Sequence, residues 1–149
     1  MANIYYNVAK KGSQDGGIDL NTDTIKMLLV EGSTAGNADH ATVTAALAVH
    51  AELSCTGYTS GVGSASRKTL TITVTQDDAN DRSDAVSNSQ TWTALGDGSI
   101  IQKALIYKHV SGADDALNIP IALIDTMTGL PFTTNGSDVI VSAQTLRAA

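Results

Sequence analysis

The sequence predicts an all-β protein, mainly antiparallel, folded as a single β-sandwich or jelly-roll-like domain with one short helix and an N-terminal arm. Short runs rich in Val, Ile, Thr and aromatic residues recur along the 149 residues, separated by Gly, Asn and Asp turn signals. Hydrophobic residues make up 42% of the chain, which suffices for one modest core. We therefore expect an N-terminal arm over 1–20 and a single sandwich domain over 21–149.

The first twenty residues begin with a short strand-like piece and then become polar and glycine-containing. Because no apolar periodicity continues through this stretch, the sequence predicts a mobile or partner-dependent arm. A frayed terminus is the alternative. We expect Ile4, Tyr5 and Tyr6 to anchor the arm on a partner, with Lys10 and Lys11 as further partner-binding residues.

The next elements are two strands and a helix. Residues 24–30 form the first expected strand. Asp39 is placed to cap a short Ala-rich helix from about 42 to 51. Residues 69–75 alternate between threonine and apolar side chains, which predicts a half-buried strand with Leu70, Ile72 and Val74 inward.

The third quarter of the chain reads as a β-hairpin. Residues 91–95 and 99–109 are rich in β-branched and aromatic residues, and they flank Gly96-Asp97-Gly98. An Asp-Gly pair supplies the positive φ that a tight hairpin needs. Two more strands follow, over 117–125 and 139–141.

Three of the expected strands, over 27–30, 101–107 and 119–124, carry apolar residues on both faces. A second sheet in so short a chain covers only one of those faces, and the helix shields part of the other. Any remaining apolar area would exceed what soluble monomers usually expose, which predicts a homo-oligomer or a component of a larger assembly. The alternative is that the helix and loops cover everything.

Net charge, cysteine content and hydropathy limit the kinds of partner and the cellular location that the sequence allows. The formal net charge of −6 disfavours binding to a phosphate backbone, so no nucleic-acid partner is expected. The single cysteine, Cys55, leaves no internal disulfide, and the N-terminus lacks the apolar core of a signal peptide. No apolar run is long enough to cross a bilayer. We expect synthesis in the cytoplasm without secretion, and no membrane partner.

Catalytic and metal-binding patterns are weak. His40, His50 and His109 are far apart in sequence, and none belongs to a metal-binding motif. Cys55 has no evident base, so a buried apolar thiol is the better interpretation. The acidic stretch 76–84 lacks the residue order of an EF-hand and contains an arginine, which favours a solvated turn. The sequence predicts no enzyme, no cofactor and no metal.

Trp92, Tyr58 and Tyr107 leave one binding function open. Aromatic side chains on a surface stack against sugar rings, so these three residues would suit a glycan-binding platform. A tryptophan in a central hairpin more often belongs to the core. The two interpretations differ in one observable, the exposure of these rings.

The order of several short pieces between residues 23 and 126 resembles small structural proteins of tailed bacteriophages, commonly head decoration (cement) proteins. The pieces are Asp23-Thr24-Ile25-Lys26, Asp39-His40, Glu52 with Thr56-Gly57-Tyr58-Thr59-Ser60-Gly61, Thr91-Trp92, Ala104-Leu105-Ile106-Tyr107-Lys108, and Leu123-Ile124-Asp125. The chain departs from the group at Gly61-Val62-Gly63, where the group has paired glycines, and at Ala41 and Val43, where it has aromatic residues.

The resemblance implies a virion protein on the outer capsid surface that binds the major capsid protein and bridges neighbouring capsomers. It also implies a homo-oligomer, with a trimer as the candidate arrangement. A neck, tail or fibre component is the alternative within the same class. A host-adhesion module that binds glycans is the alternative from another class.

Overall fold

The computed structural model of the chain describes residues 3–80, 82–110, 112, 114–127 and 129–147. The protein is all-β and mainly antiparallel, as predicted, although two helices accompany the strands where one was expected. In chain order the elements are β1 (Ile4–Tyr5), α1 (Asn7–Asp15), β2 (Ile25–Val30), α2 (Val43–Leu47), β3 (Lys68–Thr69), β4 (Ile72–Asp77), β5 (Arg82–Ser87), β6 (Gln90–Trp92), β7 (Ile100–Ile101), β8 (Lys103–Lys108), β9 (Ile119–Ile124), β10 (Phe132–Thr133), β11 (Val139–Val141) and β12 (Thr145–Arg147).

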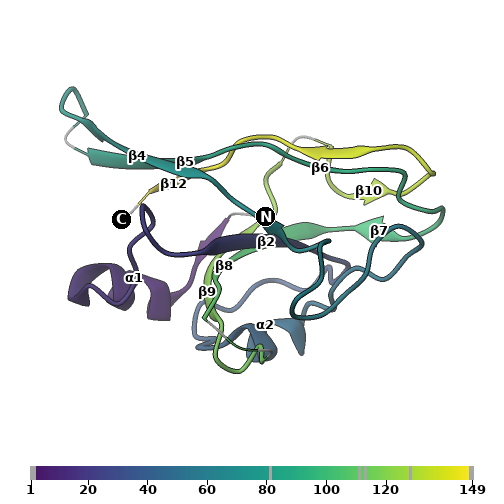
Figure 1. Cartoon of the computed structure of the whole chain (residues 1–149), viewed down its shortest axis with the longest axis horizontal. Helices are drawn as coiled ribbons and strands as arrows, with labels where there is room; N and C mark the ends of the chain where they lie inside the picture. The colour runs from purple at the N-terminus through teal and green to yellow at the C-terminus, as the bar shows by residue number, and fades with distance from the viewer. Residues whose placement is uncertain (1–2, 81, 111, 113, 128, 148–149) are drawn as a thin grey trace.

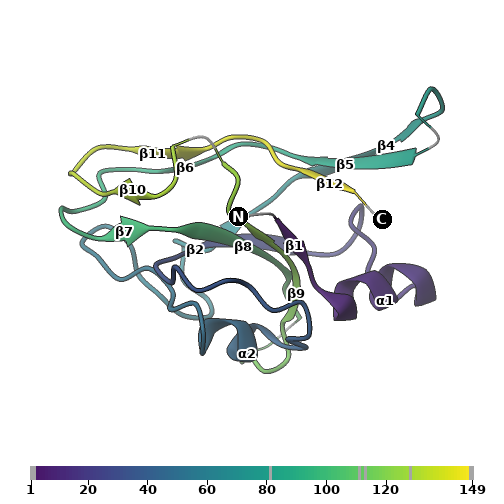
Figure 2. The same ribbon diagram turned by 180° about the vertical axis from the view of Figure 1, so that it is seen from behind.

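The largest sheet has five strands in the order β1-β9-β8-β2-β3. Its centre is the antiparallel pairing of β2 with β8, in which Leu28 lies opposite Leu105. Three smaller sheets, β12-β5-β4, β11-β6 and β10-β7, complete the set. Figures 1 and 2 show β4, β5, β6, β11 and β12 as a layer over one face of the five-stranded sheet, with α2 on the opposite face.

One extended segment links the two layers. β3 pairs with β2 of the large sheet, and the Leu70 amide then donates to the Ile25 carbonyl. From Ile72 onward the same segment pairs with β5 in the other layer. Strands that change sheets in this way form the corners of sandwiches, and here the corner fixes how the layers are joined.

The predicted hairpin around Asp97-Gly98 is wrong. β6 pairs with β11 and β7 pairs with β10, so the two flanking strands do not pair with each other. Gly98 does adopt a positive φ of 94°. Leu95, however, is fully buried, and its amide donates to the carbonyl of Ser137. Burial of Leu95 draws the connection into the core, alongside the segment that joins β10 to β11.

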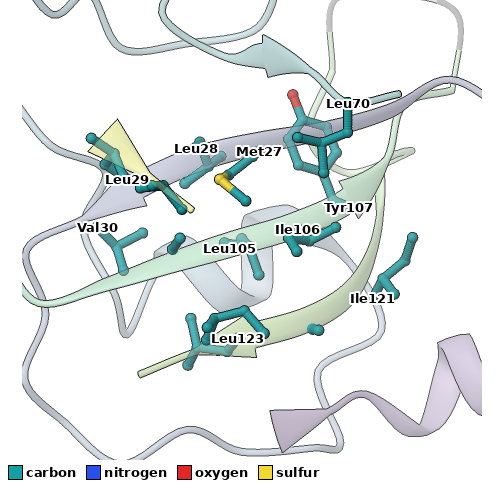
Figure 3. Close-up of a cluster of buried hydrophobic side chains, with 14 of the residues drawn as sticks. Met27, Leu28, Leu29, Val30, Leu70, Leu105, Ile106, Tyr107, Ile121 and Leu123 are labelled. Atoms are coloured by element: carbon teal, nitrogen blue, oxygen red, sulfur yellow. The ribbon is translucent and has the colours of Figure 1, made fainter. Parts of the chain in front are cut away.

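The chain covers both faces of its central strands with its own atoms. Met27, Leu28, Leu29 and Val30 of β2 are all fully buried, and Figure 3 shows their side chains packed with those of β8 and β9. The expectation of an apolar face left for neighbouring subunits is therefore wrong, and the alternative of cover by helix and loops is correct. The largely irregular segment 31–67 contributes to that cover, because it carries α2, which lies on the second face (Figures 1 and 2).

Two local predictions need correction. α2 is shorter than expected, and its N-cap is Thr42 instead of Asp39, since the Thr42 hydroxyl accepts from the Ala45 amide. The strand expected over 69–75 is buried only at its start: Leu70 is buried, whereas Val74 is 42% exposed. The reason is that β4 and β5 extend past the five-stranded sheet (Figures 1 and 2), so the strands of that sheet do not lie beneath the far end of β4.

Candidate partner-binding groove

The N-terminal segment is part of the folded domain, so the prediction of a mobile arm is wrong for its described helix and strand. β1 pairs antiparallel with β9, with Ile4 opposite Leu123. Tyr6 is fully buried, and its ring stacks on that of His40 at a centroid distance of 6.3 Å. Burial raises the pKa of Tyr6 to about 12. Tyr6 therefore anchors this segment to its own domain and is not accessible to a partner.

Helix α1 follows directly and forms one wall of a groove. The helix begins after Tyr6 and ends at Gly16, which adopts the left-handed conformation with φ of 78°. Ala9 faces inward and is buried, while Lys10 and Lys11 are exposed. The spacing of Tyr6 and Ala9, three residues apart, places both on the side of the helix that meets the sheet.

The groove lies between α1, the end of β9 and strand β12. It has a volume of about 190 Å³ and is lined by Tyr5, Ala9, Lys10, Ser13, Gln14, Leu20, Ile121, Leu146 and Arg147. The Tyr5 hydroxyl spans it and donates to the Thr145 carbonyl. Of the five residues predicted to bind a partner, the structure thus places Tyr5 and Lys10 in one concave site. Ile4, Tyr6 and Lys11 lie outside its lining.

Charges at the groove are unevenly compensated. Lys11 pairs with Asp15 one turn along the helix, and Arg147 pairs with Asp84 of β5 at 2.9 Å. The hydrogen bond from Arg147 lowers the pKa of the half-buried Asp84 carboxyl. Lys10 has no ion-pair partner within the described part of the chain. The groove therefore combines an apolar floor with one positive charge available to an acidic group.

A separate polar cluster is buried beneath the second face of the large sheet. The Arg67 guanidinium, only 1% exposed, makes paired hydrogen bonds to Glu52 at 2.9 and 2.6 Å and to Asp115 at 2.6 and 2.8 Å. It also lies over the Tyr107 ring, 5.7 Å from the centroid. Burial alone would raise the pKa of Asp115, but hydrogen bonds from Arg67 and Asn118 outweigh it and the pKa is lowered.

This Arg67 cluster has a structural role, because it links separate segments of the chain. It fastens the segment around Glu52 and the turn at Asp115 to strand β8, and its hydrogen bonds are made inside the domain. Bidentate geometry of this kind offsets the cost of burying charge. The cluster therefore explains how an irregular segment covers an apolar sheet face. The charged atoms of Arg67, Glu52 and Asp115 are already hydrogen-bonded to other described residues.

The glycan platform that the sequence left open does not form. Trp92 is 2% exposed and Tyr58 5%, and Tyr107 is likewise buried. The Trp92 indole donates to the Ser66 carbonyl, and the Tyr58 hydroxyl donates to Glu52. All three rings are core residues, as the more frequent interpretation of a central tryptophan predicts.

The histidines and the cysteine occupy separate environments. His50 is fully buried, and within the described residues neither ring nitrogen has a hydrogen-bond partner. Burial lowers the pKa of His50, and nearby Lys103 lowers it further. Lys103 is itself buried and donates to the Thr34 carbonyl. Burial also raises the pKa of the Cys55 thiol, which keeps it protonated at neutral pH.

Among the described residues no group of three His, Cys, Asp or Glu side chains is arranged to hold a metal ion. In the acidic stretch, Asp77 at the end of β4 pairs with Arg82 at the start of β5 at 3.0 Å. No helix in the described ranges has the length and apolar character needed to cross a membrane.

Comparison with family models, curated protein sequences and solved structures finds no match to this chain. The fold and the groove are therefore interpreted from the chain's own geometry.

Sequence reasoning missed two parts of the groove. The first is helix α1. Its signal in the sequence was Gly16, because glycine often follows the last residue of a helix. The inward side of the helix carries Tyr6 and Ala9, which are buried in the structure. The second is the opposite wall, Leu146 and Arg147, which comes from a three-residue strand near the end of the chain. No local pattern predicts that this strand lies beside the N-terminal helix.

Proposed function

We propose that this protein is a structural component of a tailed-bacteriophage virion, and specifically a decoration (cement) protein on the outer capsid surface. The proposal starts from the ordered resemblance over residues 23–126. In the fold, several residues of that pattern meet in one place: Glu52 binds Arg67, Tyr107 lies beneath Arg67, and Tyr58 donates to Glu52. The shared residues thus hold the fold together. A family of proteins that bind different partners through different surfaces would be expected to share residues of this kind.

The role we propose is binding, without catalysis. The major capsid protein is the proposed partner, and the groove between α1 and β12 is the proposed contact. The observation that carries this assignment is the lining of the groove, where Tyr5 and Lys10 frame an apolar floor that includes Leu20 and Leu146. We propose that an apolar side chain of the capsid protein enters the groove and that an adjacent carboxylate pairs with Lys10.

Charge reversal on helix α1 tests the groove. Lys10→Glu places a negative charge in the lining, whereas Lys11→Glu alters the next residue, which is outside the lining and paired with Asp15. Binding is measured by co-sedimentation with undecorated capsids of the phage that encodes the chain. We expect Lys10→Glu to weaken binding about tenfold and Lys11→Glu to leave it within about twofold. Equal effects of the two changes would contradict the groove assignment.

The number of copies per particle tests the virion role itself. Cryo-electron microscopy of the intact particle, with quantitative mass spectrometry, should find the protein in hundreds of copies on the head. A handful to dozens of copies at the neck or tail would replace the decoration role with the tail-component alternative. Absence from purified particles would contradict both.

A further inference from the structure

Within the described part of the chain, no strand pairs with the outer edge of β4. In the sheet β12-β5-β4, strand β4 is at the edge, and Figures 1 and 2 show its hairpin with β5 reaching past the five-stranded sheet on the side of α1. An edge strand presents backbone N–H and C=O groups to any strand that can lie beside it.

The direction of these backbone groups follows from the bonds around β4. Thr71 faces β5, because its carbonyl accepts from the Asn88 amide and its own amide donates to the Asn88 side chain. The Leu70 amide points the other way, to Ile25 of β2. Alternation along an antiparallel strand then directs the amides and carbonyls of Ile72, Val74 and Gln76 away from β5.

Strand β4 lacks the features that usually protect an edge. Residues 69–76 contain no charged residue and no proline, and the register of β4 with β5 is regular over all six residues. Lysine, proline and bulges are the common devices that block edge pairing. Val74 is also among the most exposed large apolar side chains of the described chain, at 42%.

The available edge has a symmetric centre. β2 occupies the edge at Leu70, and the acidic turn begins at Asp77, so the free stretch runs from Ile72 to Gln76 with Val74 at its midpoint. An antiparallel pairing of two identical strands about that midpoint places Val74 opposite Val74, Thr73 opposite Thr75, and Ile72 opposite Gln76. No like charges face each other in this pairing. The outward amides and carbonyls of Ile72, Val74 and Gln76 in each copy form hydrogen bonds with those of the other copy.

We propose that the β4 edge binds the β4 edge of a second copy of this chain, joining two three-stranded sheets into one sheet of six strands. A contact between identical patches must be self-complementary, and the free stretch of β4 meets that condition. Because this register sets Ile72 of one copy opposite Gln76 of the other, the body of the second copy lies past the tip of the first hairpin. This inference does not depend on the virion role.

The dimer should be weak in free solution. An edge-to-edge contact of this length is small compared with standard interfaces, which bury about 1,200 Å² or more. We expect a dissociation constant of about 10 to 1,000 μM. Copies held close together on a common surface would associate more readily, because the effective concentration is then higher.

Sedimentation velocity over a range of concentrations, with variants at Val74, tests the proposal. Val74→Lys sets two like charges opposite each other at the two-fold axis, so the dissociation constant should rise by about tenfold or more. Val86→Lys is the matched control, since Val86 is similarly exposed but lies on β5, away from the free edge. It should leave association unchanged. Circular dichroism and the melting temperature establish that both variants are folded.

A mixing experiment tests the register. Val74→Lys and Val74→Glu should each associate about tenfold or more weakly than the wild type when alone, and an equimolar mixture should restore the dimer because opposite charges then meet at the axis. A wild-type protein that stays monomeric throughout the concentration range would overturn the proposal. So would a dimer that tolerates Val74→Lys, or a mixture that fails to associate.

Discussion

The central sheet and the β4–β5 hairpin are both built from antiparallel strands but are stabilised in different ways. Strands β2 and β8 are buried on both faces, and the Arg67 cluster fastens an irregular segment over one of them. The hairpin has β12 on one side, and most of its β4 residues are exposed or half-buried. The difference indicates that most of the folding free energy resides in the sheet, while the hairpin is a surface that is free to bind.

The two regions should differ most in the free energy of unfolding that is lost when an arginine is replaced. Arg67→Met leaves Glu52 and Asp115 partly or wholly buried without their counter-charge, so the free energy of unfolding should fall by about 3–5 kcal/mol. Arg82→Met in the hairpin breaks exposed pairs with Asp77 and Asp84 and should cost at most about 1 kcal/mol. Urea denaturation measures both. Comparable losses would show that stability is not concentrated around the sheet.

Truncation of apolar side chains sharpens the same contrast. Leu105→Ala opens a cavity in the fully buried centre of β8 and should lower the free energy of unfolding by about 2–5 kcal/mol. Val86→Ala in the hairpin removes a side chain that is 38% exposed and should cost less than about 1 kcal/mol. Thermal and urea unfolding of the two variants provide the measurement. A small effect at Leu105 would contradict the packing described for the sheet.

Between about pH 7 and pH 5, where histidine titrates, a pH dependence should come from the sheet side. Burial is the main cause that lowers the pKa of His50, and the positive charge of Lys103 lowers it further. Because the folded-state pKa lies below the unfolded value of about 6.5, His50 contributes stability that is present above that pH and is lost as the pH falls through the folded pKa.

Replacement of the imidazole checks this expectation. The free energy of unfolding of the wild type should decrease between about pH 7 and pH 5, and His50→Gln should show a shallower decrease. His109→Gln is the matched control. An unchanged slope in His50→Gln would show that His50 does not carry the acid sensitivity.

The smallest effect is expected at the helix that covers the sheet. Thr42→Ala removes the hydroxyl that caps α2 through the Ala45 amide, which should cost about 1 kcal/mol. Asp39→Ala, at the residue that the sequence favoured as the cap, should change stability less. Equal effects would show that the cap assignment in the structure is wrong.

The sequence was most informative where local pattern and burial agree. The strands at β2, β8 and β9 were predictable because β-branched and apolar runs are bounded by turn residues. Their apolar character on both faces was also read correctly, but its consequence was not, because nothing local indicates that residues 31–67 fold back over the sheet. That cover depends on Arg67 reaching Glu52 and Asp115 across 15 and 48 residues of sequence.

Pairing was predicted less well than strand positions. The Asp-Gly signal at Gly98 was real as a turn, yet the flanking strands found partners more than thirty residues away. The groove was half predictable: Tyr5 and Lys10 could be singled out, whereas its other wall required the tertiary placement of β12. Long-range pairing of short strands carries no local signature, which is why these features emerge only in the folded chain.

Amide hydrogen exchange followed by NMR at two protein concentrations tests the contrast between sheet and edge most directly. The amides of Leu28 and Leu105 should exchange slowly at both concentrations, since both strands are internal to the sheet. The amides of Ile72, Val74 and Gln76 should exchange rapidly in dilute protein and become protected in concentrated protein. Rapid exchange at Leu28 and Leu105, or protection at β4 that does not change with concentration, would contradict the contrast between a stable central sheet and a β4 edge that binds a second copy.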